Sequence, residues 1–261
     1  MNDILDKIVE YKRKEVIYQA QYKPLSELEK SDYFEKPCLS TKSFLTDSTK
    51  TGIIAEFKRK SPSKGIINDK SKVADVVLAY EKFGASCISV LTDEEFFGGS
   101  ISDLQITKEM VKIPVLRKEF IVNEYQVYQT KSIGADLILL IAEVLTKEEI
   151  KQFAKTAKKI GLEVLLEMHS EDQLQKICNE IDIIGINNRD LKSFQVDLNH
   201  SIRMLKRIPD GFLKIAESGI SSVEDLNKLK NAGFEGFLIG ENFMKDENPA
   251  LAFERFTEQI I

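Results

Sequence analysis

Residues 131–141 read KSIGADLILLI, and this stretch decides the fold because the same unit returns along the chain. An amphipathic, helix-like segment ends at a glycine, and an apolar run follows. Glycine suits the left-handed conformation that closes a helix. A short apolar run suits a strand that is buried on both faces of a parallel sheet. Further copies of the unit are EKFGASCISVL (81–91), KKIGLEVLLEM (158–168) and KNAGFEGFLIG (230–240).

Four more apolar runs lack that glycine but lie where further strands are due. They are TGIIAEFK (51–58), KIPVLRKEF (112–120), IDIIGINNR (181–189) and FLKIAESGI (212–220). Between the strand candidates, apolar residues recur at helical spacing, which predicts helices. The clearest predicted helices are 70–83, 146–160 and 222–232. Thr146 with Glu149 and Ser222 with Asp225 are plausible N-terminal capping pairs for the last two.

Strands and helices that alternate eight times predict a TIM (β/α)8 barrel, a fold that typically takes ~250 residues. A doubly wound open sheet is the alternative, but its GxGxxG fingerprint does not follow the first strand. We expect a single TIM-barrel domain over 1–261, with the barrel at 49–261. Residues 1–48 are expected to form a helical extension packed on the barrel, with helices from Ile4 to about Gln21 and around Pro24 to Glu29.

Composition narrows the class of protein. Of 261 residues, 37 are Lys or Arg and 42 are Asp or Glu, and the net charge of −5 argues against nucleic-acid binding. Cys38, Cys87 and Cys178 lack CxxC spacing, which argues against a disulfide framework or a metal site and favours a reducing compartment. The charged N-terminus has no signal-peptide core, and no run reaches the ~20 apolar residues of a membrane span. We therefore expect a soluble cytoplasmic protein.

The first predicted strand carries charge where an apolar run should continue. In IIAEFKRKSPSKG (53–65), Ile54, Glu56 and Lys58 share one face, because side chains alternate along a strand. Phe57 on the other face suits the layer that packs against helices. Glu56 and Lys58 would then point into the barrel at the carboxyl end of the strand, where barrel active sites are built.

Four other predicted strands end in the same way. Their inward polar residues are Lys118, Glu167, Asn187, Arg189 and Glu217. A single charge at a strand end is more often a solvated rim residue. Inward polar residues at the ends of five strands are not expected by chance. Buried charges are also costly unless they are paired. The sequence therefore predicts a site of mixed charge at the barrel mouth.

Two glycine-containing turns follow the last two strands. ESGI (217–220) precedes a predicted helix, and LIGENFM (238–244) leads into a short helical turn. TIM barrels frequently bind phosphate between these two loops, with backbone N–H groups and a helix N-terminus. Lys58 and the loop SPSKG (61–65) could add charge and hydroxyl groups from across the mouth.

The chain resembles the indole-3-glycerol phosphate synthase family along nearly its whole length. The segments that carry the resemblance are IIAEFKRKSPSKG, ISVLTDEEFFGGS (88–100), PVLRKEFI (114–121), LLEMH (165–169), IGINNRDL (184–191), IAESGI (215–220) and LIGENFM. The resemblance implies a cofactor-free TIM-barrel enzyme of tryptophan biosynthesis. Its substrate would be 1-(2-carboxyphenylamino)-1-deoxyribulose 5-phosphate, and its products indole-3-glycerol phosphate, carbon dioxide and water. Glu119 and Asn188 depart from the residues that many relatives carry, but both are expected off the inward face.

The resemblance also implies a role for each inward group. Lys118 would be the acid in ring closure, with Glu167 as a base or charge stabiliser. Glu56 and Lys58 would serve the dehydration and hold anionic parts of the substrate. The remaining implied residues orient or bind the substrate. They are Asn187, Arg189 and Glu217 for orientation, Phe97, Phe120, Leu139 and Ile141 for the anthranilate ring, and Ser61, Ser218, Gly219, Gly240 and the backbone of Glu241 toward the phosphate.

Alternative functions share some of these features. Another phosphate-binding barrel, such as a sugar-phosphate isomerase or aldolase, would use the same two loops. A non-catalytic barrel that only binds a phosphorylated ligand would have no need for both inward lysines and Glu167. His169 and His200 lack metal-ligand spacing and receive no role. The expected partner is a small phosphorylated substrate, and a loose association with other tryptophan-pathway enzymes stays open.

Overall fold

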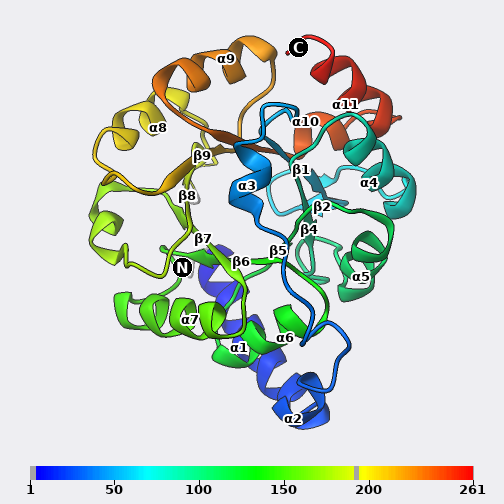
Figure 1. Ribbon diagram of the computed structural model, residues 1–261, viewed down its shortest axis with the longest axis vertical. Helices are drawn as coiled ribbons and strands as arrows, with labels where there is room; N and C mark the ends of the chain where they lie inside the picture. The colour runs from blue at the N-terminus through cyan, green and yellow to red at the C-terminus, as the bar shows by residue number, and fades with distance from the viewer. Residues whose placement is uncertain (1–3, 191–193, 261) are drawn as a thin grey trace.

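The computed structural model describes residues 4–190 and 194–260, and its centre is a closed barrel of parallel strands (Figure 1). The barrel strands are β1 (Ile53–Phe57), β4 (Cys87–Leu91), β5 (Val115–Lys118), β6 (Leu137–Ile141), β7 (Glu163–Met168), β8 (Ile183–Asn187), β9 (Leu213–Glu217) and β10 (Gly236–Ile239). Each strand pairs with the next, and β10 returns to β1, so every barrel strand has two neighbours. The predicted TIM barrel and its eight strands are confirmed.

Helices surround the barrel in the order that the sequence predicts (Figure 1). They are α4 (Val73–Lys82), α5 (Ile101–Met110), α6 (Glu124–Ser132), α7 (Lys147–Lys159), α8 (Leu198–Leu205), α9 (Val223–Ala232), α10 (Glu241–Met244) and α11 (Pro249–Thr257). Between β7 and β8 the connection is a 3₁₀ helix, Glu171–Lys176, where a regular unit would carry an α-helix. Both predicted capping pairs are present, Thr146 with Glu149 and Ser222 with Asp225.

Side-chain alternation divides the core into two layers. Leu116, Leu165 and Ile215 belong to the cluster inside the barrel, together with Ile54. Phe57 belongs to the larger cluster between the strands and the surrounding helices. The prediction of which β1 side chains face inward is therefore confirmed. The same alternation points every second residue at the carboxyl end of the strand toward the barrel axis.

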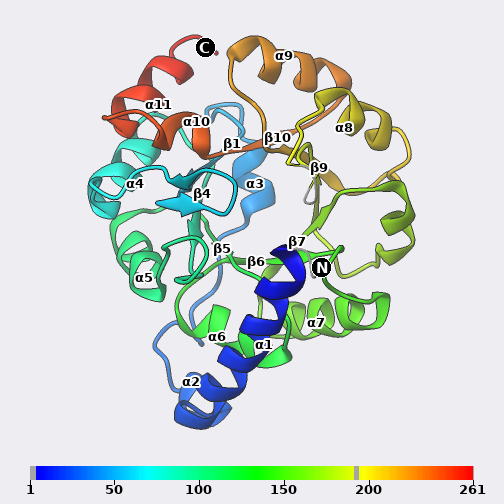
Figure 2. The ribbon, with the colours of Figure 1, turned by 180° about the vertical axis from the view of Figure 1, so that it is seen from behind.

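Within residues 4–52, three helices precede the barrel and reach both of its ends. They are α1 (Ile4–Tyr22), α2 (Leu25–Leu28) and α3 (Thr41–Leu45), and the first two agree with prediction. Residues 1–3 of the expected extension lie outside the described residues. Helix α3, which the sequence did not predict, lies across one end of the barrel (Figure 1). Its Leu45 joins the cluster of inward strand residues. The start of α1 lies at the other end, which Figure 2 shows from the front.

The first strand–helix loop has structure of its own. Strands β2 (Lys60–Ser61) and β3 (Gly65–Ile66) pair antiparallel in a hairpin that the sequence did not predict. Arg59 at its base donates to the carboxylate of Asp103 at 2.5 and 2.9 Å, which joins this loop to α5. Within the described ranges, no helix has the length and apolar character needed to cross a membrane.

Leu45 gives a test of the role of α3. We expect Leu45→Ala to lower the free energy of unfolding by about 2–5 kcal/mol, because it opens a cavity at the packed end of the barrel. The matched control is Leu78→Ala, at a position that is 43% exposed, with an expected cost of about 0.5 kcal/mol or less. Urea unfolding of both variants measures the difference, and equal values would contradict this account of α3.

Candidate active site

A cavity lies at the carboxyl ends of the barrel strands, where the sequence predicts the site. Every predicted site residue except Leu139 lines it. From the strand ends these are Glu56, Lys58, Lys118, Glu167, Asn187, Arg189 and Glu217, and from the mouth and loops Ser61, Phe97, Phe120, Ile141, Ser218, Gly219, Gly240 and Glu241. The strands are short and in regular register, so the same layer of each strand reaches the same depth.

Leu139 lies elsewhere, and this corrects its predicted place beside the substrate ring. It is 1% exposed and packs with the inward cluster below the cavity. In the register of β6 and β7, Leu139 pairs with Leu165, whereas Ile141 pairs with Glu167. Because a strand shows each face at every second residue, Leu139 is one layer deeper than the site.

Lys118 and Glu167 form the central ion pair of the cavity. Lys118 Nζ lies 3.1 Å from Glu167 Oε2, and Asn187 Nδ2 donates to Glu167 Oε1 at 2.9 Å. His169 Nε2 lies 3.2 Å from the same Oε1. The three strands β5, β7 and β8 each supply part of this arrangement, because their carboxyl ends meet at one end of the barrel.

The ion pair decides how both groups are charged. Burial alone would raise the pKa of Glu167, but the Lys118 charge and the neighbouring donors hold that pKa well below its ordinary value. Burial lowers the pKa of Lys118, and the charges of Glu167, Glu217 and Glu56 outweigh it, so the net shift is upward. Lys118 is therefore an ammonium and Glu167 a carboxylate at neutral pH.

Glu217 behaves in the opposite way. Its side chain is buried at the end of β9, and it pairs in register with Asn187 of β8. Burial, and then the negative charge of Glu167, raise the pKa of Glu217 well above its ordinary value. Two neighbouring carboxyl groups thus have pKa values that are pushed apart, a pattern that is typical of acid and base pairs in active sites.

The second ion pair of the cavity lies on β1. Lys58 Nζ donates to Glu56 Oε1 at 2.6 Å, and both side chains are largely buried. Gly240 at the end of β10 is next to this pair. A Cβ atom at Gly240 would lie 2.7 Å from the Cβ of Glu56, so only glycine leaves room for the Glu56 side chain here.

The loops after β9 and β10 form the rim of the cavity. Ser218 and Gly219 both have positive φ, 66° and 72°. For the non-glycine residue Ser218 this conformation is strained, and such strain is found more often at functional sites than elsewhere. Arg189 Nη2 lies 3.2 Å from Glu241 Oε2, and Lys64 Nζ lies 3.9 Å from Glu241 Oε1. The Glu241 carboxylate therefore balances part of the positive charge at the rim.

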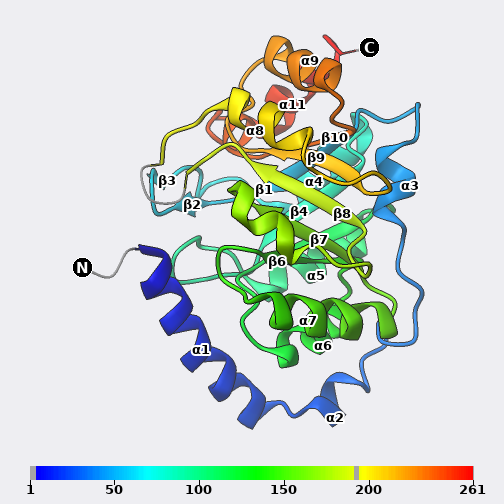
Figure 3. The same ribbon diagram turned by 90° about the vertical axis from the view of Figure 1, so that its left-hand side faces the viewer.

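Sequence reasoning missed two contributions to the site. Ile4, Leu5 and Ile8 of α1 line the cavity, and Figure 3 shows α1 beginning beside the mouth. The apolar face of α1 was a sequence signal for packing, but only the chain path places that face at the mouth. His169 contacts Glu167 and comes two residues after it in the chain. Strand alternation puts residues at that spacing on the same face, so the sequence did contain a signal for this contact. Among the described residues, no cluster of His, Cys, Asp or Glu could hold a metal ion.

Together, the closed barrel and a buried cavity of mixed charge at its carboxyl end define an enzyme of the TIM-barrel class. The model of the indole-3-glycerol phosphate synthase family matches residues 5–256. The chain belongs to the indole-3-glycerol phosphate synthase family and is thus a decarboxylating lyase of tryptophan biosynthesis.

Relatives of known family match this chain over nearly its whole length. An indole-3-glycerol phosphate synthase of Bacteroides thetaiotaomicron is 44% identical over 260 residues, which covers 100% of both chains. One of Prochlorococcus marinus is 41% identical and covers 99% of this chain and 90% of the relative. Among solved structures, the 3-hexulose-6-phosphate synthase of Salmonella typhimurium has a TM-score of 0.63 at 14% identity, covering 80% of this chain and 97% of that one. That likeness shows the barrel fold alone.

Gly240 tests whether the β1 ion pair matters to turnover. We expect Gly240→Ala to lower kcat/KM by about tenfold or more, because the added methyl group displaces Glu56 and with it Lys58. Gly161→Ala is the matched control, since a Cβ there would meet nothing within 4 Å. Its positive φ of 83° should reduce stability only, with kcat/KM unchanged. Steady-state kinetics on both variants checks the difference.

Glu217 predicts a slope of stability with pH. A carboxyl whose folded-state pKa is raised binds more protons in the folded chain than in the unfolded chain, so stability falls as pH rises above the unfolded pKa. The slope is at most about 1.4 kcal/mol per pH unit for one group. We expect urea unfolding from pH 5 to 8 to show this fall in the wild type and a flatter profile in Glu217→Gln. Identical slopes would contradict the raised pKa.

Proposed function

We propose that Lys118 is the acid that drives ring closure of 1-(2-carboxyphenylamino)-1-deoxyribulose 5-phosphate. The observation that carries this proposal is the buried pair between Lys118 Nζ and Glu167 Oε2 at 3.1 Å. The pair keeps Lys118 as an ammonium, and both residues line the cavity. The ammonium can therefore donate a proton to a bound substrate. A proton donor held in a water-poor site is most effective where charge develops in the transition state.

Ring closure requires that one proton be donated to the ketone oxygen of the substrate. The aromatic carbon that bears the carboxylate forms a bond to the ketone carbon, and the electron pair of the C=O bond moves to oxygen. That oxygen takes a proton from Lys118 Nζ, because the developing alkoxide is far more basic than an amine. Loss of carbon dioxide then returns the electron pair to the ring, with the aniline nitrogen as the internal electron sink.

Glu167 serves the same step as a charge stabiliser. Its pKa is held low by Lys118, so it is a weak base in the resting site and a strong electrostatic partner for the lysine. Asn187 Nδ2 donates to its second oxygen at 2.9 Å, and His169 Nε2 lies 3.2 Å from the same oxygen. This support from β7 and β8 keeps Lys118 directed toward the cavity.

The last step, loss of water, needs an acid and a base. One group protonates the departing hydroxyl, and another removes the proton that restores the aromatic five-membered ring. We assign these roles to the Glu56 and Lys58 pair, which lies on β1 with Nζ and Oε1 2.6 Å apart. Glu217, whose raised pKa favours its protonated form, would donate a hydrogen bond to a substrate hydroxyl.

Substrate binding divides the cavity into a polar and an apolar part. The phosphate would bind at Ser61, Ser218, Gly219, Gly240 and the backbone of Glu241, all of which line the cavity. Backbone N–H groups in such loops suit an anion. Arg189 would orient the substrate carboxylate. Phe97, Phe120 and Ile141 would hold the anthranilate ring, together with Ile8 of α1.

The charge state of Lys118 argues against a Schiff-base aldolase. An imine-forming lysine needs a lowered pKa so that its amine is neutral. Here the net shift of the Lys118 pKa is upward. Borohydride treatment in the presence of substrate should therefore leave the protein mass unchanged.

The setting of the enzyme is part of the proposal. Cys38, Cys87 and Cys178 are all free thiols, which supports a reducing, cytoplasmic location. We also propose one folding domain over 1–261, with 1–48 as its extension.

Lys118→Ala tests the acid directly. We expect kcat to fall by about 10²–10⁴ with KM changed little, because the lost proton transfer affects the transition state more than binding. The assay follows the indole fluorescence of the product without added metal, and the protein itself has no Trp. Lys14→Ala is the control, since Lys14 is 75% exposed on α1. A folded Lys118→Ala variant with wild-type kcat would exclude the assignment.

A further inference from the structure

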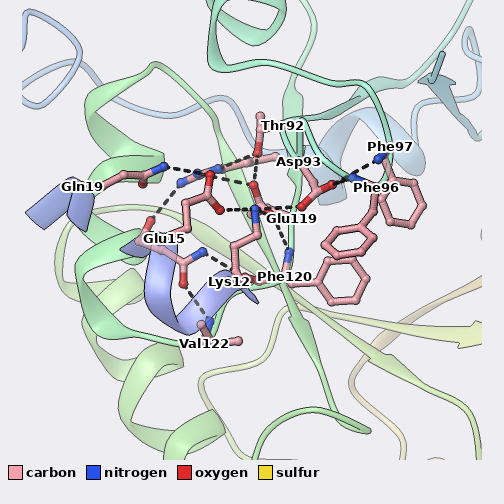
Figure 4. Close-up of polar contacts among 12 residues, drawn as sticks. Lys12, Glu15, Gln19, Thr92, Asp93, Phe96, Phe97, Glu119, Phe120 and Val122 are labelled. Atoms are coloured by element: carbon pink, nitrogen blue, oxygen red, sulfur yellow. Dashed lines mark hydrogen bonds and ion pairs between the residues drawn. The ribbon is translucent and has the colours of Figure 1, made fainter. Parts of the chain in front are cut away.

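A buried lysine of the N-terminal helix lies under one wall of the cavity. Lys12 of α1 is 2% exposed, and Figure 4 shows its ammonium among carboxylates from three segments of the chain. Lys12 Nζ lies 2.6 Å from Glu15, 2.9 Å from Asp93 and 3.2 Å from Glu119. Isolated buried ammonium groups are costly, so this arrangement depends on all of its partners.

Asp93 carries the contact into the loop after β4. Its other oxygen, Oδ1, accepts hydrogen bonds from the backbone N–H groups of Phe96 at 2.7 Å and Phe97 at 3.1 Å. Phe97 lines the cavity. The carboxylate therefore links the charge on α1 to the backbone that presents this ring.

Glu119 does the same in the loop after β5. Its Oε1 contacts Lys12 and also accepts the backbone N–H of Phe120 at 2.8 Å, while Oε2 accepts the Thr92 hydroxyl at 2.7 Å. The rings of Phe97 and Phe120 are neighbours, with centroids 5.9 Å apart. One ammonium thus contacts both carboxylates that hold the two rings (Figure 4).

The balance of charge makes Lys12 difficult to replace. Burial lowers the pKa of Lys12, but the charges of Glu119 and Asp93 outweigh it, and the net shift is upward. Arg117 is the other buried cation nearby, and its Nη2 is 3.8 Å from Glu119 Oε2. Without the ammonium, the buried carboxylates of Asp93 and Glu119 would repel each other. Their displacement would also shift the backbone N–H groups of Phe96, Phe97 and Phe120, from which they accept hydrogen bonds.

A second contact joins α1 to the same loop. The rings of Tyr11 and Phe96 meet edge to face, with centroids 5.6 Å apart. Helix α1 therefore touches this loop through an aromatic pair and an ion pair at neighbouring positions. The contact from Lys12 acts on both loops, whereas the Tyr11 contact acts on one.

We propose that Lys12 is a positioning residue that sets the spacing of Phe97 and Phe120, and so the affinity of the cavity for the aromatic ring of the substrate. This inference rests on the proposed function, which places the anthranilate ring against these side chains. Lys12 would touch neither the substrate nor the reacting atoms. Its replacement should weaken ring binding and leave the phosphate end of the cavity, formed by the loops after β9 and β10, as it was.

Two ligands separate ring binding from general damage. Indole-3-glycerol phosphate carries both ring and phosphate, and glycerol 3-phosphate carries the phosphate without the ring. In Lys12→Met we expect product affinity, measured by calorimetry, to fall about tenfold and glycerol 3-phosphate affinity to stay within about twofold. KM should rise by a similar factor while kcat stays within about threefold, because Lys118 and Glu167 are untouched.

Matched variants complete the test. Lys12→Arg keeps the charge and should recover most of the product affinity, and Lys14→Met removes a lysine two residues away on the exposed face and should change nothing. Circular dichroism and urea unfolding establish that each variant is folded. If Lys12→Met does not fold, Asp93→Asn replaces it, since asparagine keeps an oxygen for the Phe96 and Phe97 amides but loses the ion pair. There we expect about a threefold loss of product affinity.

The results separate this inference from the proposed function. Unchanged product affinity in a folded Lys12→Met variant, or in Asp93→Asn if the first does not fold, overturns the role of Lys12. Equal loss of affinity for both ligands, with no recovery in Lys12→Arg, also overturns it, because that pattern indicates general loosening. Absence of turnover by the wild type with binding of both ligands intact counts against the proposed function, while the ratio of affinities still decides the role of Lys12.

Discussion

A carboxylate in the dry interior of a barrel stays ionised only when a cation lies beside it, and the site of this enzyme is built on that constraint. Glu167 is 2% exposed and keeps its charge because Lys118 is 3.1 Å away. The lysine in turn keeps its proton because carboxylates surround it. Either group alone would lose its charge or destabilise the fold, so Lys118 and Glu167 depend on each other.

The same constraint recurs outside the cavity. Lys12 with Asp93 and Glu119 is a second buried group of mixed charge, and it lies between α1 and the loops that carry Phe97 and Phe120. Buried charges of this kind accept few geometries, because each must meet its partners at short range. A network with few permitted geometries is a suitable device for holding an apolar wall in place. The N-terminal helix is in this respect part of the site and not only a cover for the barrel.

Sequence reasoning was strongest where a local pattern repeats. Alternation along β1 correctly assigned Ile54 to the interior and Phe57 to the helix-facing layer. Its weakness was depth: alternation puts Leu139 and Ile141 on one face but does not say which layer the cavity reaches. It also missed the contact of His169 with Glu167, although the two residues stand at the spacing that puts both on one face of a strand. The 3₁₀ helix after β7 and the β2–β3 hairpin were missed because short elements carry weak patterns.

By itself the sequence determined the order of strands and helices, the faces of the strands and the set of polar residues at their carboxyl ends. These follow from periodicity, since a strand repeats every two residues and a helix every 3.6. Only the tertiary structure decided which of these groups pair. Lys118 and Glu167 are 49 residues apart in the chain, and Lys12 and Glu119 farther still, so their contacts depend on barrel closure and on the path of α1. Charge pairing at such separations is a property of the packed molecule, because no local pattern records which distant segment supplies the opposite charge.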